Sequence, residues 1–112
     1  MPIELLQNIL QPLCSNIYQQ GSAPAEYPAR FFTFWNSDTP AKKHYDNGAF
    51  GYLWEFDIYF YSTDPLDIYS TMEQARTALL AAGWTVNGKG FAAMSDFPTH
   101  TGRGLHITYT EI

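Results

Sequence analysis

The feature that most constrains the fold is the segment 51–61, in which two sets of large side chains alternate along the chain. Successive side chains of a β-strand point to opposite faces. One set would therefore lie together on one face of a sheet: Tyr52, Trp54, Phe56, Ile58 and Phe60. The other set is Leu53, Glu55, Asp57, Tyr59 and Tyr61, and we call the sheet face that carries it the second face. The first set predicts a hydrophobic core, whereas the second mixes apolar and charged residues.

Other segments also have strand character. Residues 29–36 predict a strand, because aromatic residues in a row with a β-branched residue suit a pleated surface. Two short extended runs, 84–86 and 90–94, flank Asn87-Gly88, a residue pair typical of hairpin turns. Residues 95–104 are polar and predict a loop. The last segment, 105–112, alternates, with Leu105, Ile107 and Tyr109 inward and His106, Thr108 and Thr110 outward.

Two segments predict helices. Residues 3–20 place Leu6, Ile9, Leu10, Leu13, Ile17 and Tyr18 at helical spacing, and Pro12 predicts a kink or a helix in two pieces. Asp64 and Pro65 mark the start of a second helix, which runs to about Ala82 before Gly83. Its buried stripe is predicted to contain Ile68, Met72, Ala75, Leu79 and Ala82.

Together these elements predict an α+β fold with the order α-β-β-α-β-β-β, in which the third and fourth strands are short. No long crossover joins neighbouring strands, so we expect a mainly antiparallel sheet of about four strands with both helices packed on one face. The 112 residues are expected to form a single domain, 1–112.

Composition excludes several classes of function. A formal net charge of -5 argues against a general nucleic-acid binder, which needs a basic surface. The single cysteine, Cys14, allows no intrachain disulfide and no cysteine-based metal site, and a reducing compartment is expected. The sequence predicts no signal peptide and no membrane span. Only 15% of residues are charged, below the roughly 25% of average domains, which indicates a surface partly covered by a partner.

Few residues suggest chemistry. His44, His100 and His106 lack the spacing of metal ligands, and His106 is interpreted as a solvated residue of the last strand. Glu55 and Asp57 lie roughly 6–7 Å apart along one strand face, a separation that a glycosidase pair could have. Two outward positions on a half-exposed strand explain them more simply. We therefore predict no catalytic, cofactor-binding or metal-binding residues, and no enzyme.

The second face is the most informative feature for function. Two helices can cover one side of the sheet, so the second face is left toward water, and either Phe31 with Trp35 or Phe32 with Phe34 must join it. That set is too apolar for a purely solvated face, and a contiguous apolar patch marks an interaction surface. The alternative is that the connection 36–50 folds back over it.

Several runs of the sequence resemble a known group of proteins. They are Phe-Phe-Thr-Phe-Trp at 31–35, His-Tyr-Asp-Asn at 44–47, the strand 54–62 followed by Asp-Pro at 64–65, and Gly-Trp at 83–84. From about residue 3 to 112 the chain resembles small tail-component proteins of siphophages and prophages. Within that group it is most similar to tail terminator (tail completion) and minor tail proteins.

The resemblance implies an α+β subunit of the virion tail, assembled in the bacterial cytoplasm. It implies a ring of identical subunits, usually a hexamer, that caps the tail tube and meets the head-connector proteins, without catalytic residues, cofactor, nucleic acid or membrane. Interface roles then fall on the second face and on the connection 36–50, where Lys42, Lys43 and His44 form a small basic cluster. The interface residues so predicted are Phe31, Trp35, Leu53, Glu55, Asp57, Tyr59, Tyr61, Lys42, Lys43 and His44.

Three alternatives stay open on the sequence. Head-closure and head–tail joining proteins are also small and similar in appearance. A small-ligand-binding module would use aromatic residues such as Trp35, Trp54 and Tyr59 to line an apolar pocket. An enzyme would use Glu55, Asp57 or a histidine, and would place a strongly perturbed carboxylate or histidine inside a cleft.

Overall fold

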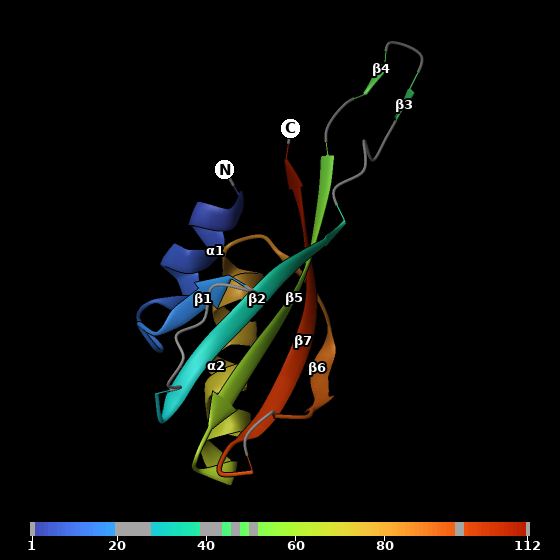
Figure 1. Ribbon diagram of the computed structural model, residues 1–112. Helices are drawn as coiled ribbons and strands as arrows, with labels where there is room; N and C mark the ends of the chain where they lie inside the picture. Colours follow the sequence, from blue (N-terminus) through green and yellow to red (C-terminus); the bar gives the residue numbers. More distant parts are fainter. Residues whose placement is uncertain are drawn as a thin grey trace.

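The computed structural model describes residues 2–19, 28–38, 44–45, 48–49, 52–95 and 98–111 (Figure 1). Within these ranges the chain forms two helices and seven strands. In chain order they are α1 (Pro2–Leu10), β1 (Ile17–Gln19), β2 (Arg30–Asp38), β3 (His44–Tyr45), β4 (Gly48–Ala49), β5 (Tyr52–Ser62), α2 (Pro65–Ala81), β6 (Thr85–Ala93) and β7 (Thr101–Glu111).

The main sheet has the strand order β1-β2-β5-β7-β6. The pairs β2–β5, β5–β7 and β6–β7 are antiparallel, whereas β1 runs parallel to β2. Strands β3 and β4 pair with each other in a separate ladder. The predicted α+β class with two helices is confirmed, but the sheet is mixed and has five strands rather than about four.

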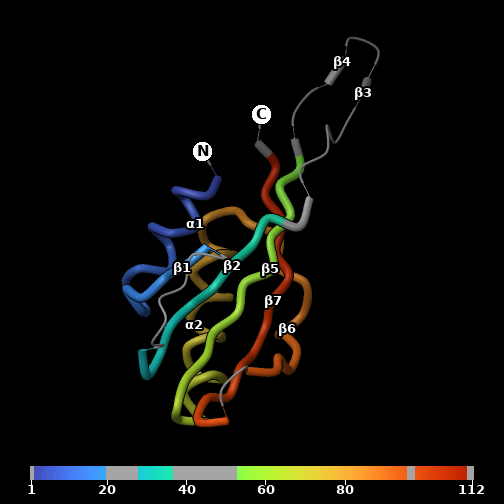
Figure 2. The backbone as a smooth tube through the Cα atoms, in the orientation of Figure 1, coloured from blue at the N-terminus to red at the C-terminus, as the bar shows by residue number. Residues whose placement is uncertain are grey.

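Both helices lie on one face of the sheet, and the tube in Figure 2 shows β2 and β5 crossing in front of α2. The core forms between these layers, and a fully buried Phe or Leu side chain there stabilises the fold by about 1.5–3 kcal/mol. Its main members are Leu6, Leu10, Phe32, Phe34, Phe56, Ile58, Phe60, Met72, Leu79, Trp84, Leu105 and Ile107. Of the inward set predicted for residues 51–61, Phe56, Ile58 and Phe60 lie in the core and Trp54 is partly buried against it, whereas the side chain of Tyr52 is outside what the structure describes.

The first predicted helix is much shorter than expected. Helix α1 ends at Leu10, two residues before Pro12, and Ile17–Gln19 form strand β1 beside β2. Proline has no N–H to continue the helical ladder and disfavours helical geometry in the residue before it. The backbone after Pro12 then forms β1, which pairs with the edge of β2. Ile17 still packs against the core, so its apolar character fits the strand as well as the predicted helix.

Helix α2 agrees closely with the prediction. The Asp64 carboxylate accepts a hydrogen bond from the Leu66 N–H at 3.0 Å, and Pro65 occupies the first helical position. Gly83, directly after the C-cap residue Ala82, has a φ of 91°, which glycine adopts without strain. Ala82 is exposed, contrary to the prediction, and Thr71 is buried instead.

The predicted hairpin at Asn87 does not form. Strand β6 continues through that point with a register irregularity between Asn87 and Phe91, where Gly88 and Gly90 have positive φ angles. Arginine side chains bind the carbonyl oxygens of this bulge: Arg76 Nε donates to Gly88 O at 3.1 Å and Arg103 Nη2 to Lys89 O at 3.3 Å. Asn-Gly therefore produces a bulge, because the strand beyond it continues to pair with β7.

Strand β7 also begins earlier than predicted, at Thr101 rather than Leu105. It pairs with β5 from Ser62↔Thr101 to Tyr52↔Glu111. Four residues of the predicted polar loop are therefore strand residues, because β5 is 11 residues long and its backbone groups need partners along that length. No helix among the described residues is long and apolar enough to cross a membrane.

Candidate functional site

The register of the sheet decides which aromatic residues lie on the second face. Phe31 is opposite Tyr61, Thr33 opposite Tyr59, and Trp35 opposite Asp57. Directly paired residues share a face, so Phe31 and Trp35 join the second face. Phe32 and Phe34 belong to the core instead.

Two glycines in β7 allow aromatic rings to lie flat over the sheet. Gly102 is opposite Tyr61, and a Cβ atom at Gly102 would lie 2.5 Å from Cε1 of that ring. Gly104 lies under Tyr59 and under Phe91 of β6, whose ring takes the space of a Cβ. The sequence analysis missed Phe91 and both glycines because it assigned 95–104 to a loop. The alternation of glycine at 102 and 104 continues the period of the last strand and was the available signal.

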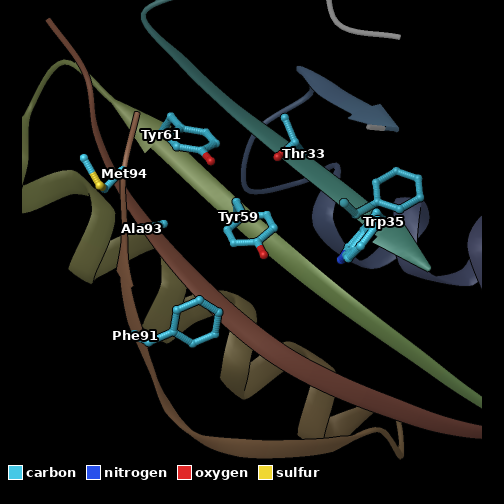
Figure 3. Close-up of a pocket in the computed structure, with 8 residues that line it drawn as sticks. Thr33, Trp35, Tyr59, Tyr61, Phe91, Ala93 and Met94 are labelled. Atoms are coloured by element: carbon cyan, nitrogen blue, oxygen red, sulfur yellow. The ribbon is translucent and has the colours of Figure 1, made fainter. Parts of the chain in front are cut away.

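These rings surround a hollow of about 310 Å³ on the second face (Figure 3). Its walls come from β2, β5, β6 and the residue after β6, Met94. Three wall side chains are well exposed, namely Met94 at 93%, Trp35 at 44% and Phe91 at 42%. The lining residues are Thr33, Phe34, Trp35, Tyr59, Tyr61, Phe91, Ala93 and Met94.

A polar network borders the hollow at Trp35. The Trp35 Nε1–H donates to Asp57 Oδ2 at 3.0 Å, and Asp57 Oδ1 lies 2.7 Å from His106 Nδ1. His106 Nε2 lies 3.4 Å from Glu55 Oε1. His106 is therefore outward-facing as predicted, but it stands between two carboxylates rather than free in solvent. The sequence did not show this contact because strand pairing brings together residues 49 positions apart.

The charge of Asp57 acts on Tyr59, one of the residues that line the hollow. The pKa of the Tyr59 hydroxyl is raised above its ordinary value, first by burial and then by the charge of Asp57. Each effect disfavours a second negative charge at that place. The Tyr59 hydroxyl consequently keeps its proton beside the Asp57 carboxylate.

The polar groups of the network are already bound to one another. Both ring nitrogens of His106 contact carboxylates, and both oxygens of Asp57 are bound within the chain. A search of the described residues finds no group of three or more His, Cys, Asp or Glu side chains placed to hold a metal ion. Cys14 is buried and its Sγ lies 3.5 Å from Arg30 O, as a small core thiol would.

The other predicted interface residues differ in their surroundings. Phe31 is only 2% exposed, because the rings of Tyr18, Tyr61 and His100 surround it at centroid distances of 6.2, 5.1 and 5.8 Å. Its ring stacks against that of Tyr61, and almost none of it is accessible to a partner. Leu53 is half-buried on the second face.

The structure says little about the basic cluster Lys42, Lys43 and His44 or about the connection 36–50 that carries it. Lys42 and Lys43 lie outside the described residues, as does most of 36–50, so the predicted fold-back of that connection does too. His44 is described only through its backbone, which pairs with Ala49.

A ligand pocket shared by Trp35, Trp54 and Tyr59 does not form. Trp54 lies on the helix side of the sheet, where its ring stacks with Phe56 at a centroid distance of 6.1 Å. Alternation along β5 separates it from Tyr59, which is on the second face.

Comparisons with known proteins identify a shared fold. No family model matches the sequence, and no curated protein matches it. Among solved structures, 11 chains match, and one of them belongs to the virion of native gene transfer agent (GTA) particle. That match has a TM-score of 0.59 at 14% identity and covers 96% of this chain and 90% of the other. At this identity the likeness shows a common fold over almost the whole of both chains.

Proposed function

We propose that this protein is a structural subunit of a phage-derived particle. The observation that carries the proposal is the fold shared, almost end to end, with a protein of the gene transfer agent virion. The resemblance of the sequence to small phage tail components points in the same direction. An exposed aromatic hollow supports the same conclusion, since subunits of an assembly bury such patches against their neighbours.

Within such a particle, we propose the station of tail terminator. In this role identical subunits form a ring, usually a hexamer, at the head-proximal end of the tail tube and contact the head connector. The support is the resemblance of the strand segments 31–35 and 54–62 to that group of proteins. Head-closure and head–tail joining proteins are the competing stations.

The second face would then be a contact surface in the virion. Its exposed aromatic residues lie on the side of the sheet that both helices leave uncovered. A small-ligand module is less well supported. The hollow is at the lower limit of the roughly 300–1,000 Å³ typical of ligand pockets, and the Asp57–His106 network borders it without lining it.

Deletion of the gene in a particle-producing host tests the proposal. A terminator stops growth of the tube, so its loss is expected to give overlong tubes that are not joined to heads. A head-closure or joining protein would instead leave tails of normal length, detached from heads. Electron microscopy of the particles measures tube length and attachment. Normal, infectious or transducing particles from the deletion strain would refute a structural role of either kind.

The purified chain provides a second measurement. Light scattering and negative-stain microscopy, at rising concentration and with the tube protein of the same particle, are expected to reveal rings. A strict monomer that never associates with tube protein would count against the terminator station.

A further inference from the structure

We infer that the hollow on the second face receives a cationic side chain, arginine or lysine, from a protein other than this chain. The inference adds a partner chemistry to the proposed function and rests on it only for the partner's place in the same particle. It follows from three observations: the aromatic walls, the carboxylates beside them, and the excess of acidic over basic residues in the chain itself.

The aromatic walls suit a cation. Trp35, Tyr59 and Phe91 come from three different strands and surround one hollow, as the sticks in Figure 3 show. A guanidinium or ammonium group is attracted to the face of an aromatic ring within about 6 Å of its centroid. At about 310 Å³ the hollow is small, which fits one side chain better than a large cofactor.

The bordering carboxylates supply the complementary charge. Asp57 is held by Trp35, a wall residue of the hollow, and Glu55 follows on the same face through His106. The carboxylate side chains retain 20% and 29% exposure, so they are partly shielded from water without being removed from it. An apolar ligand would gain from the rings alone, whereas a cation gains from both the rings and the charges.

The chain itself is a poor source of the cation. It carries 6 Lys and Arg residues against 11 Asp and Glu, a net charge of -5. Among the described residues, the three arginines are already bound within the chain: Arg30 to Asp67, Arg76 to Glu73 and Gly88 O, and Arg103 to Lys89 O and the Tyr69 ring. A second copy would also bring its own excess of negative charge. A basic segment of a different protein is therefore the better complement.

Peptide titration followed by NMR tests the inference. The probe is the peptide Ser-Gly-Arg-Gly-Arg-Gly-Ser, and its matched control replaces both arginines with citrulline, which keeps the shape and removes the charge. The arginine peptide is expected to shift the Trp35 indole N–H and the Gly102 and Gly104 amides saturably. The citrulline peptide should bind more weakly, by up to about fivefold, which is the scale expected for loss of an exposed cation–π contact. Absence of saturable shifts, or equal binding of both peptides, would overturn the inference.

Three variants separate the site from general charge attraction. Asp57→Asn keeps the shape of the side chain, Phe91→Leu keeps an apolar strand residue, and each should weaken arginine-peptide binding several-fold. Glu4→Gln removes the same charge from an exposed position of α1, on the other side of the sheet, and should leave binding unchanged. Amide dispersion in the same spectra verifies folding. If Glu4→Gln weakened binding as much as Asp57→Asn, the binding would be non-specific charge attraction and the inference would be wrong.

The two proposals fail in different ways. Shifts of the Trp35 indole signal that grow with protein concentration in the absence of peptide would identify a second copy as the occupant and refute the foreign partner. Normal peptide binding with normal particles from the deletion strain would reject the structural role alone. Overlong tubes in the deletion strain without any peptide binding would reject the cation site alone.

Discussion

Arg30 joins three parts of the fold through one guanidinium group. It pairs with Asp67 of α2 at 2.9 Å between Nε and Oδ2 and at 3.2 Å between Nη2 and Oδ1. It also donates to Leu13 O at 3.2 Å and to Thr71 Oγ1 at 3.0 Å. Burial acts to raise the pKa of the Asp67 carboxyl, but hydrogen bonds from Arg30, Thr71 and Ser62 outweigh it and the pKa falls below its ordinary 3.8.

This pairing predicts a pH-dependent stability. Replacing Asp67 by asparagine should lower the free energy of unfolding at pH 7 by about 1–2 kcal/mol, a value reduced for solvent screening because Arg30 is 41% exposed. A carboxyl with a depressed folded-state pKa stabilises above its unfolded pKa, and that stabilisation is lost as pH falls through the folded value. The difference between wild type and Asp67→Asn should therefore be full above pH 3.8 and shrink below it.

Urea unfolding at several pH values measures this difference. Glu73→Gln is the control, because its pair with Arg76 lies on the exposed face of α2 and should contribute under about 0.5 kcal/mol. A difference for Asp67→Asn that stays constant down to the lowest pH would contradict the assignment of the depressed pKa to this pair.

At the scale of elements, strands β6 and β7 depend on contacts between glycine and aromatic rings. Gly104 is covered by Phe91 and Tyr59, and Gly102 by Tyr61. Glycine in a strand normally weakens it, because it has no side chain to pack and more backbone freedom to lose. Here the missing side chain makes room for rings from the two neighbouring strands.

Gly104→Ala is accordingly predicted to destabilise the protein. Strand propensity alone would make alanine neutral or stabilising, but its Cβ would overlap the Phe91 ring and lie 3.0 Å from Tyr59 Cδ1. Overpacking of this kind costs about 1–3 kcal/mol. Thr110→Ala, at an exposed position of the same strand and face, is the control for general strand effects. An increase in the urea midpoint for Gly104→Ala would show that the rings do not depend on the glycine.

Local signals predicted some elements well and others poorly. Asp64 and Pro65 defined the start of α2, because capping depends on side chains within one helical turn. The apolar spacing of residues 3–20 could not distinguish α1 from β1, since Ile17 would face the core in a helix or in a strand. Asn87-Gly88 suited a hairpin turn as well as a bulge, and only pairing with β7 distinguishes the two.

For the whole molecule, the two faces of the sheet have different roles. The helix side contains the core, and the second face contains the exposed aromatic residues of the hollow. Phe56 is fully buried and Phe91 is 42% exposed, although both are phenylalanines on strands of one sheet. The fold should therefore depend on the first far more than on the second.

Alanine at each position tests this asymmetry. Phe56→Ala should lower the free energy of unfolding by about 3–5 kcal/mol, a large share of the roughly 5–15 kcal/mol of a whole domain. Phe91→Ala should cost about 1 kcal/mol, because much of its ring already contacts water. Urea unfolding compares the two variants directly. Equal losses would mean that the second face is part of the core.

The sequence by itself determined which side chains of β5 face the core, where α2 begins and that one sheet face keeps aromatic residues. These properties follow from periodicity and capping, which act over a few neighbouring residues. Only the tertiary structure decided that β1 joins the sheet, that β6 bulges, and that His106 meets Glu55 and Asp57. Backbone pairing between distant segments selects these contacts, and backbone hydrogen-bonding groups are alike in almost every residue. The hollow beside Trp35 exists for the same reason, because three strands distant in sequence build its walls.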